Sequence, residues 1–418
     1  MERHLGLWSR YWRHPCHRQH SGASGQVEAR VRRSACTTCT LNVSKTDVTT
    51  QRSEVIDLLK AFACVLIVWH HLALYGPMSD VVYQLAPRFI GLLFDYGLLA
   101  VEVFLVVGGY LNAKSWLRAL SQAHFEFFPR LGARFQRLAI PLMAALCFTV
   151  AVTALVRPYF DHSSLSDAPS PLKVLAHIFL LQDVLYVEAF SAGVWYVAID
   201  FQLFVMALLC ATLAHRWQAV TQQGSVIRKA WGMWMAMTLI SMFVWNLNPL
   251  GEVWGTYFFC AYGLGLCVGS WRALGFNIHH RILVLWMILI GGLAWGYEPR
   301  VRLLVAVGVA VLLALYEATD CRPLPCLKAS WIQALSNASY AVFLIHFGVS
   351  LLVSAVVFTH GSESLPANGL GMLTSFGLSV ALGAGLHVAI EKQTPSWQRW
   401  LQWTAAFAAT CTAVMLLT

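Results

Sequence analysis

The chain has 418 residues, of which 58% are apolar and only 12% are charged. Soluble domains carry about 25% charged residues, so this composition excludes an ordinary soluble protein and indicates a polytopic membrane protein. The formal net charge of +9 would suggest nucleic-acid binding in a soluble chain. Here we attribute it to basic loop residues of the kind that set membrane topology, and we expect no nucleic-acid partner.

Residues 1–51 do not share the apolar pattern. They are rich in arginine and histidine and contain Cys36 and Cys39. We expect this basic tail to be disordered, or to be an artefact of an upstream start codon. A zinc site is conceivable there, but the spacing matches no standard finger, and we predict no metal site in the chain.

Apolar stretches near the roughly 20 residues that cross a bilayer recur along the rest of the chain. They cover about 56–75, 91–112, 138–156, 194–214, 230–247, 254–270, 282–297, 301–318, 336–358, 369–390 and 401–418. We therefore predict an all-α, polytopic membrane helix bundle with about 10 core transmembrane helices and an eleventh at its end. The expected domains are the tail, a membrane domain over 52–392 and an extra helix within 393–418.

The distribution of basic residues predicts the orientation. With the N-terminus in the cytoplasm, most loop lysines and arginines are cytoplasmic, as the positive-inside rule requires. The opposite loops then hold only Arg88, Arg157, Lys173, Arg300 and Arg302. Segment 172–190 leaves no room for another crossing in this scheme, and we interpret it as an outer interfacial or re-entrant piece.

Lys60 and His71 form the most informative pair, because both lie in or beside the first apolar stretch. Eleven residues place them about 20° apart around a helix and about 16 Å apart along it. His70 lies about 80° away on the other side, so we choose His71. An intramembrane histidine is a functional candidate by default. The alternative is a packed histidine with a lysine anchor below it.

Arg134 and Arg137 stand three residues apart in a loop that we expect to be cytoplasmic. At the start of a helix this spacing lets both guanidinium groups face one anion, and the arginine fork suits phosphate. The alternative is ordinary positive-inside anchoring.

Two acids lie inside predicted spans, Glu102 and Asp200. Each is costly there without a partner, and both fall at a depth similar to that of His71. We expect Glu102 to orient the imidazole and to stabilise its protonated form, with Asp200 as a further acid. The alternative for each is a structural hydrogen bond. His346 is either a second polar wall of the site or a satisfied core histidine.

These residues belong to an ordered set of motifs that resembles the membrane acyltransferase-3 family, which includes O-antigen acetylases. The motifs are Ile56–Lys60 followed by His71, Val101–Tyr110 around Glu102, Arg134 and Arg137 with Pro141, Trp195–Gln202, Ser339–His346, and Glu391 with Lys392. The sequence departs from the family pattern at Lys60 (usually arginine), Gly108 (serine), Asp200 (glutamate) and Gln393 (proline). The shorter arm of Asp200 makes its role the least certain to transfer.

The resemblance implies an O-acyltransferase of a bacterial inner membrane. It would move an acyl group, acetyl as the first expectation, from cytoplasmic acyl-CoA to a hydroxyl of a surface or exported saccharide, with no bound cofactor. Lys60, Arg134 and Arg137 would bind acyl-CoA, and His71, Glu102 and Asp200 would be catalytic. His71 would act as general base or carry the acyl group, and His70, Trp195 and His346 would line the site.

Two rival interpretations remain at this point. A transporter of a small molecule or lipid-linked substrate can also use intramembrane histidines and acids as a proton relay, although no inverted repeat stands out. A non-catalytic partner in a polysaccharide assembly would keep the fold without turnover.

Overall fold

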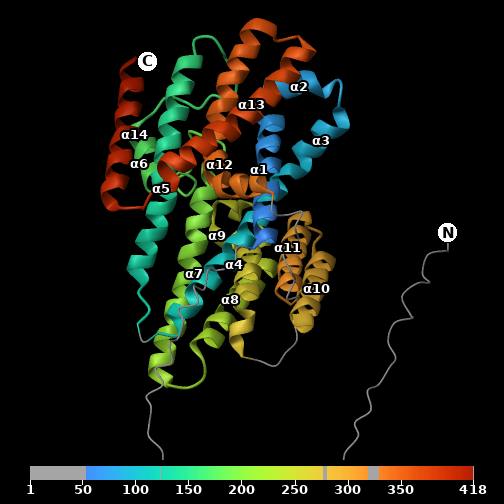
Figure 1. Cartoon of the computed structure of the whole chain (residues 1–418), viewed down its shortest axis with the longest axis vertical. Helices are drawn as coiled ribbons and strands as arrows, with labels where there is room; N and C mark the ends of the chain where they lie inside the picture. Colours follow the sequence, from blue (N-terminus) through green and yellow to red (C-terminus); the bar gives the residue numbers. More distant parts are fainter. Residues whose placement is uncertain (1–52, 123, 276–279, 319–328, 418) are drawn as a thin grey trace, which may run out of the picture. The chain divides into compact units, whose positions relative to one another are not determined.

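The computed structural model describes residues 53–122, 124–275, 280–318 and 329–417, so the basic tail 1–51 and the zinc site considered there lie outside the described residues. The described part of the chain consists of helices and connecting segments without strands, as predicted (Figure 1). Its α-helices are α1 (Glu54–Tyr75), α2 (Pro77–Tyr83), α3 (Pro87–Tyr96), α4 (Ala100–Leu120), α5 (Phe127–Val156), α6 (Pro171–Ile178), α7 (Val194–Thr221), α8 (Val226–Phe243), α9 (Gly255–Ser270), α10 (His280–Tyr297), α11 (Val301–Ala318), α12 (Ser330–Gly361), α13 (Leu365–Leu386) and α14 (Trp397–Leu417). Shorter turns are η1 (Gly97–Leu99), η2 (Trp245–Leu247), η3 (Pro249–Val253), η4 (Trp271–Leu274) and the π-helical η6 (His387–Glu391).

Within these residues, 10 helical segments are long and apolar enough to cross a membrane. The apolar stretch 254–270 is not among them. It forms α9, whose 16 residues span about 24 Å, less than the hydrocarbon thickness of about 30 Å. Instead α9 is buried along almost its whole length and packs against α4, α8, α7 and α11. The prediction of a polytopic helix bundle is therefore confirmed, while the N-inside orientation stays a prediction.

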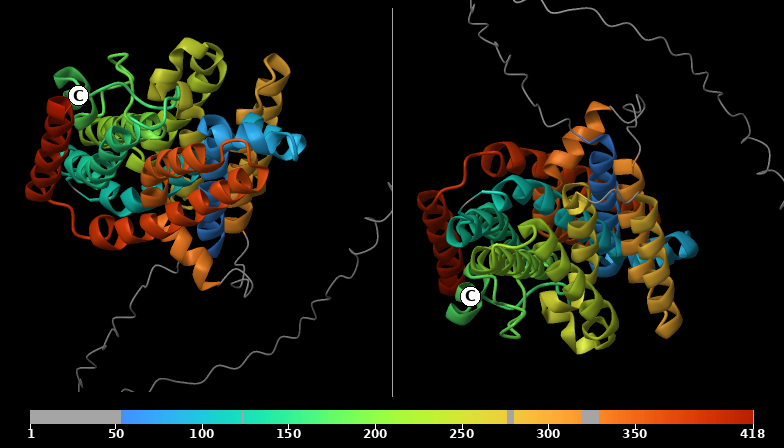
Figure 2. Two further views of the ribbon diagram at one scale, coloured as in Figure 1. Left: turned by 90° about the horizontal axis from the view of Figure 1, so that it is seen from above. Right: turned by 90° about the horizontal axis from the view of Figure 1, so that it is seen from below.

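Helix α1 is packed against several other helices of the bundle. Its start is capped by the Ser53 hydroxyl, which accepts a hydrogen bond from the Ile56 amide (3.4 Å), and Glu54 lies in its first turn, where an acid favours the helix dipole. α1 packs on α12, α4 and α3. The α10–α11 pair and the α14–α5 pair lie on opposite flanks in both projections (Figures 1 and 2).

The α4–α9 contact is possible only because glycines face each other across it. A Cβ at Gly109 would lie 2.0 Å from the Tyr262 carbonyl oxygen, and a Cβ at Gly265 would lie 2.0 Å from the Val106 carbonyl oxygen. Neither backbone can move away without separating the helices. These glycines therefore form close-packing faces, and the contact fixes α4 beside the buried helix α9.

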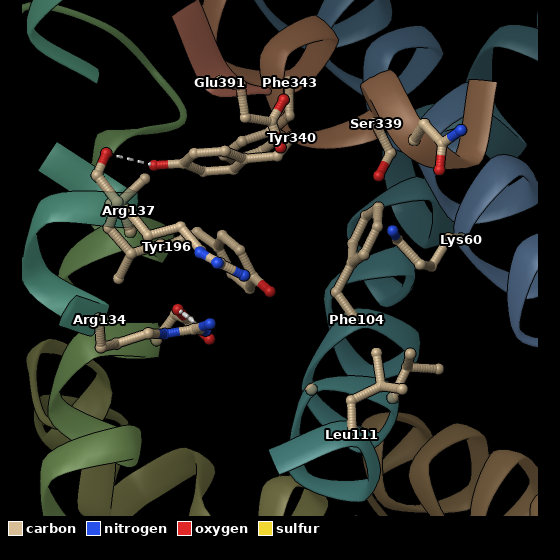
Figure 3. A pocket seen from close by; sticks show the side chains of 16 residues that line it. Lys60, Phe104, Leu111, Arg134, Arg137, Tyr196, Ser339, Tyr340, Phe343 and Glu391 are labelled. Carbon is tan, nitrogen blue, oxygen red and sulfur yellow. Dashed lines mark hydrogen bonds and ion pairs between the residues drawn. The ribbon is translucent and has the colours of Figure 1, made fainter. Parts of the chain in front are cut away.

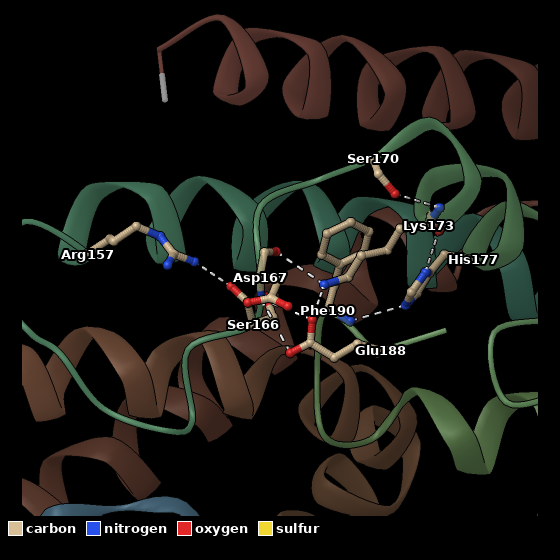
Figure 4. A network of polar contacts seen from close by, with 8 residues as sticks. All are labelled: Arg157, Ser166, Asp167, Ser170, Lys173, His177, Glu188 and Phe190. Carbon is tan, nitrogen blue, oxygen red and sulfur yellow. Dashed lines mark hydrogen bonds and ion pairs between the residues drawn. The ribbon is translucent and has the colours of Figure 1, made fainter. Parts of the chain in front are cut away.

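A strap over residues 157–193 contains α6 and is held by polar contacts (Figure 4). The buried Lys173 ammonium bonds to the Glu188 carboxylate (2.5 Å) and to the Asp167 carbonyl (3.1 Å), and Arg157 donates to the Ser166 carbonyl. The eight residues of α6 are far too few to cross a bilayer. The strap is therefore a tethered connection between α5 and α7.

His177 is a buried residue that joins two parts of the strap by hydrogen bonds. The Phe190 amide donates to its Nε2 (3.1 Å), so its Nδ1–H donates to the Lys173 carbonyl (2.7 Å). Both bonds require the neutral imidazole. Burial lowers the pKa of His177 to about 4, the hydrogen bond to Lys173 opposing the shift in part.

This pKa predicts that the strap loosens in acid. The folded strap binds fewer protons at His177 than the unfolded strap does, so its stability falls as the pH drops from about 6.5 towards about 4. Limited proteolysis of the detergent-solubilised protein should show faster cleavage within 157–193 across this window. His177→Gln should flatten the dependence, whereas His162→Gln in the same strap should keep it. A cleavage rate that is independent of pH would contradict the assignment.

Candidate functional site

A cavity of about 190 Å³ lies between α1, α4, α5, α7, α12 and η6 (Figure 3). We call it the basic cavity, because three cations line it. Arg134 and Arg137 of α5 lie on one side and Lys60 of α1 lies across from them. Its other polar lining residues are Tyr196, Asp200, Asn337, Ser339, Tyr340 and Glu391. The structure thus brings together all three residues that we predicted to bind an anionic ligand.

Asp200 pairs with Arg134 rather than with a histidine. The two groups are 2.5 Å apart, their side chains are only 6% and 21% exposed, and the Arg134 guanidinium also covers the Phe204 ring at 5.4 Å. We expected Asp200 at the depth of His71, as a second acid of the catalytic group. That placement is wrong: one face of α7 carries Asp200 to the basic cavity, where it positions a guanidinium.

Arg137 is exposed and connects the basic cavity to a second hollow of about 260 Å³. Lys392 and Arg399 line this second hollow with it. Arg137, Lys392 and Arg399 therefore line the second hollow, which we take as the entrance, and Arg134 and Lys60 line the basic cavity beyond it. Such a cluster attracts a ligand that carries several negative charges.

His71 and His70 line a different cavity, of about 290 Å³, which we call the histidine cavity. Three charged residues share it, Asp183 of the strap, Glu252 of η3 and Arg302 of α11. The Glu252 carboxylate bonds to the Arg302 guanidinium at 2.8 Å. Burial raises the pKa of the Asp183 carboxyl, and the hydrogen bond from Gln182 opposes this shift.

His71 is hydrogen-bonded to His346 across the α1–α12 contact. Nδ1 of His71 lies 2.6 Å from Nε2 of His346, and the rings are nearly coplanar at 8°. Nδ1 of His346 lies 2.6 Å from the Phe343 carbonyl oxygen, which can only accept. The neutral pair therefore has one consistent arrangement, in which Nδ1–H of His346 donates to Phe343 and Nδ1–H of His71 donates to His346. This leaves the lone pair of His71 on Nε2.

His70 is held differently from its neighbour. Its Nδ1 bonds to the Leu93 carbonyl of α3 (2.9 Å), and its Cβ fills the space beside Gly97, where a side-chain carbon would come within 2.5 Å. His70 is thus anchored to the peripheral helix α3. Angular spacing along the first span chose His71 over His70. In the structure, of these two residues, only His71 bonds to another side chain.

We expected Glu102 to orient the His71 imidazole, but Nδ1 of His71 bonds to His346 instead. Glu102 is buried on α4, and the charged groups that act on it are Arg302 and Glu252. Position along a span does not determine which helix faces meet, and a catalytic role for Glu102 stays a prediction.

An aromatic wall separates the two cavities. Trp195 lines the histidine cavity and the next residue, Tyr196, lines the basic cavity. Tyr196 meets Phe343 edge to face at 5.3 Å. Gly193 leaves room for the Phe343 ring, since a Cβ there would lie 2.8 Å from it. Phe343 therefore touches both sites, with its ring on the basic cavity and its carbonyl on His346.

Sequence reasoning missed this wall and the charged rim. Tyr196 and Phe343 lie inside the motifs Trp195–Gln202 and Ser339–His346, but nothing in the sequence indicated that the two rings meet. From the sequence, Glu252 and Arg302 could be assigned only as charged loop residues. An acid and a base at neighbouring helix ends could, however, have indicated the ion pair that they form. Among the described residues no group of three His, Cys, Asp or Glu side chains is placed to hold a metal ion.

The fold and the two cavities define a multi-pass membrane protein with a buried histidine pair between a cationic pocket and a carboxylate-lined pocket. A family model described as an acyltransferase domain, that of the acyltransferase-3 family, matches residues 54–418. The chain therefore belongs to the acyltransferase-3 family. The match includes α14, beyond residue 392, where we expected the family domain to end.

A curated relative is the "Regulator of hypoxia-inducible factor 1" of Caenorhabditis elegans, with 28% identity over 193 residues. The match covers 42% of this chain and 38% of the relative, so the chain matches well under half of that protein's length. No solved structure matches the chain.

The Arg134–Asp200 pair predicts an asymmetric mutational effect. Arg134→Ala leaves a buried carboxylate without its partner, which typically costs about 3–5 kcal/mol, so the yield of folded protein should fall sharply. Adding Asp200→Asn should restore part of that yield, because the uncompensated charge is removed. Gel filtration of detergent extracts measures the yield, with the exposed Arg118→Ala as control. Full yield of the Arg134→Ala single variant would show that the pair is dispensable for folding.

Proposed function

We propose that the protein is an O-acyltransferase of a bacterial inner membrane. It moves an acyl group, acetyl in the first instance, from cytoplasmic acyl-CoA to a hydroxyl of a surface or exported saccharide. The observation that carries the proposal is the His71–His346 pair, whose arrangement of protons leaves a lone pair on His71, a residue that lines the histidine cavity. Membership of an acyltransferase family supports the reaction class.

The basic cavity suits the donor. The nucleotide end of acyl-CoA carries several phosphate charges, and Arg137, Lys392 and Arg399 surround the entrance at which they would bind. The narrower space beyond, lined by Lys60 and Tyr196, suits the uncharged pantetheine arm. Lys60 and His71 are about 16 Å apart along α1, comparable with an extended arm.

His71 acts as the general base in this scheme. Nε2 takes the proton of the acceptor hydroxyl while the oxygen attacks the thioester carbonyl. The tetrahedral intermediate then expels the thiolate, which recovers the proton from His71, so that an ester and free coenzyme A result. His346 holds the ring so that Nδ1 keeps its proton and Nε2 remains the reactive nitrogen.

The reaction is tested by label transfer. Membranes with the protein should move label from acetyl-CoA to a saccharide, and His71→Ala should abolish the transfer at unchanged protein abundance, because removing a base typically costs 10²–10⁴-fold in rate. His346→Leu should lower the turnover number, and His346→Gln should restore part of it, because Oε1 can accept the Nδ1–H of His71. The exposed His360→Leu on the same helix is the control. Full activity of His71→Ala would overturn the mechanism.

Arg137 is expected to act on donor binding alone. It is exposed and lines the entrance, so Arg137→Ala should not affect folding. Loss of one charge-assisted contact, about 1.5–3 kcal/mol, should raise the KM for acyl-CoA by roughly 10- to 150-fold and leave the KM for the acceptor unchanged. Arg137→Lys should recover only part of the loss. Equal increases in both constants would indicate a topological role instead.

A further inference from the structure

The histidine cavity contains polar groups from three separate parts of the fold. Asp183 comes from the strap, Glu252 from the η3 turn and Arg302 from the start of α11. Each is held in place: Gln182 donates to the Asp183 carboxylate (2.6 Å), and Glu252 is paired with Arg302 (2.8 Å). A rim assembled in this way is not needed to close the helix bundle, which makes it a candidate binding surface.

The charges of the rim are unbalanced towards the acidic side. Two carboxylates face one guanidinium, and the buried Glu102 lies within electrostatic range of Arg302 and Glu252. Nδ1–H of His70 donates to the Leu93 carbonyl, and Nδ1–H of His71 donates to His346. Both rings are neutral and therefore add no charge. A carboxylate or phosphate brought here would meet like charges in a partly buried site, which disfavours binding.

The remaining lining is apolar, with the aromatic residues Trp195, Tyr75 and Phe258 beside aliphatic side chains. The rings of Trp195 and Phe258 are 5.8 Å apart between centroids. Tyr75 lines the same space, with its ring 5.6 Å from that of His71. A flat indole beside fixed hydrogen-bonding groups binds a compact molecule that has both an apolar face and polar edges.

We propose that the histidine cavity is the acceptor site and that it selects a non-acidic, hydroxylated ring of the sugar class over acidic or phosphorylated acceptors. This inference rests on the function proposed above. Asp183 and Glu252 accept hydrogen bonds from ring hydroxyls, and Arg302 donates to a ring or hydroxyl oxygen. Trp195 packs on the apolar face of the ring, which leaves one hydroxyl beside His71.

Binding is tested without turnover. The purified full chain in detergent is mixed in turn with methyl glucoside, glucosamine and glucuronate, and bound sugar is detected by saturation-transfer NMR. We expect strong signals from methyl glucoside and glucosamine and a much weaker one from glucuronate. Trp195→Leu should remove the signal of the glucoside ring, with Trp195→Phe as the milder variant. Asp183→Asn should raise the glucuronate signal relative to that of the glucoside, and the exposed Asp80→Asn should leave the pattern unchanged.

Kinetic measurements of the transfer reaction distinguish the acceptor site from the donor site. Asp183→Asn and Trp195→Leu should each raise the KM for the accepted sugar roughly tenfold, equivalent to about 1.4 kcal/mol, with the KM for acetyl-CoA unchanged. Asp80→Asn should change neither constant.

The outcomes distinguish the two proposals. Selective sugar binding that depends on Trp195, without any transfer of label, keeps the acceptor site and overturns the proposed transferase activity. Transfer whose sugar KM is unaffected by either variant overturns the acceptor site and keeps the transferase. Glucuronate that binds as well as methyl glucoside, or no binding of any of the three probes, overturns the acceptor site.

Discussion

The seam between α1 and α12 is the contact on which the site depends. Among the contacts that cross it are three polar ones: the Ser336 hydroxyl with the Asp57 carboxylate (2.7 Å), the Cys64 thiol with the Ser339 carbonyl (3.7 Å) and His71 with His346 (2.6 Å). The three α1 residues are spaced by seven, so they share one face of the helix. A slip of one residue along the seam would break all three contacts together. The seam thereby fixes the helix that carries Lys60 at one end of the site and His71 at the other.

The Arg134–Asp200 pair shows how a buried charge is used in this fold. Burying two ions costs about as much as their attraction returns, so such a pair is weak evidence for stability. Its consequence here is positional, because Asp200 holds one guanidinium against the wall of the basic cavity. Arg137, one turn further along α5, stays exposed at the entrance. The two arginines of one motif thus differ in role: Arg134 is positioned by Asp200 of α7, whereas Arg137 is accessible to solvent.

The sequence predicted what depends on a single helix and missed what depends on two. Composition and span length predicted the helix bundle, and angular spacing within α1 separated His71 from His70. Glu102 and Asp200 were placed near His71 because all three were expected at similar depth in their spans, but position along a span does not determine which faces of neighbouring helices meet. His346 stayed undecided between site wall and core for the same reason. Its role follows only from the packing of α1 on α12.

The contrast in charge between the cavities gives the proposed reaction its direction. A polyanionic donor is attracted by the cations of the basic cavity and repelled by the carboxylates around the histidine cavity, so its nucleotide end has one favourable place. Between them stand the Tyr196 and Phe343 rings, which the thioester must pass to reach His71. A base with a free lone pair would also activate water, and hydrolysis would waste the donor. The Phe343 carbonyl holds His346, and His346 holds His71. In the proposed reaction, an aromatic residue that lines the donor cavity and the base are therefore linked through one turn of α12.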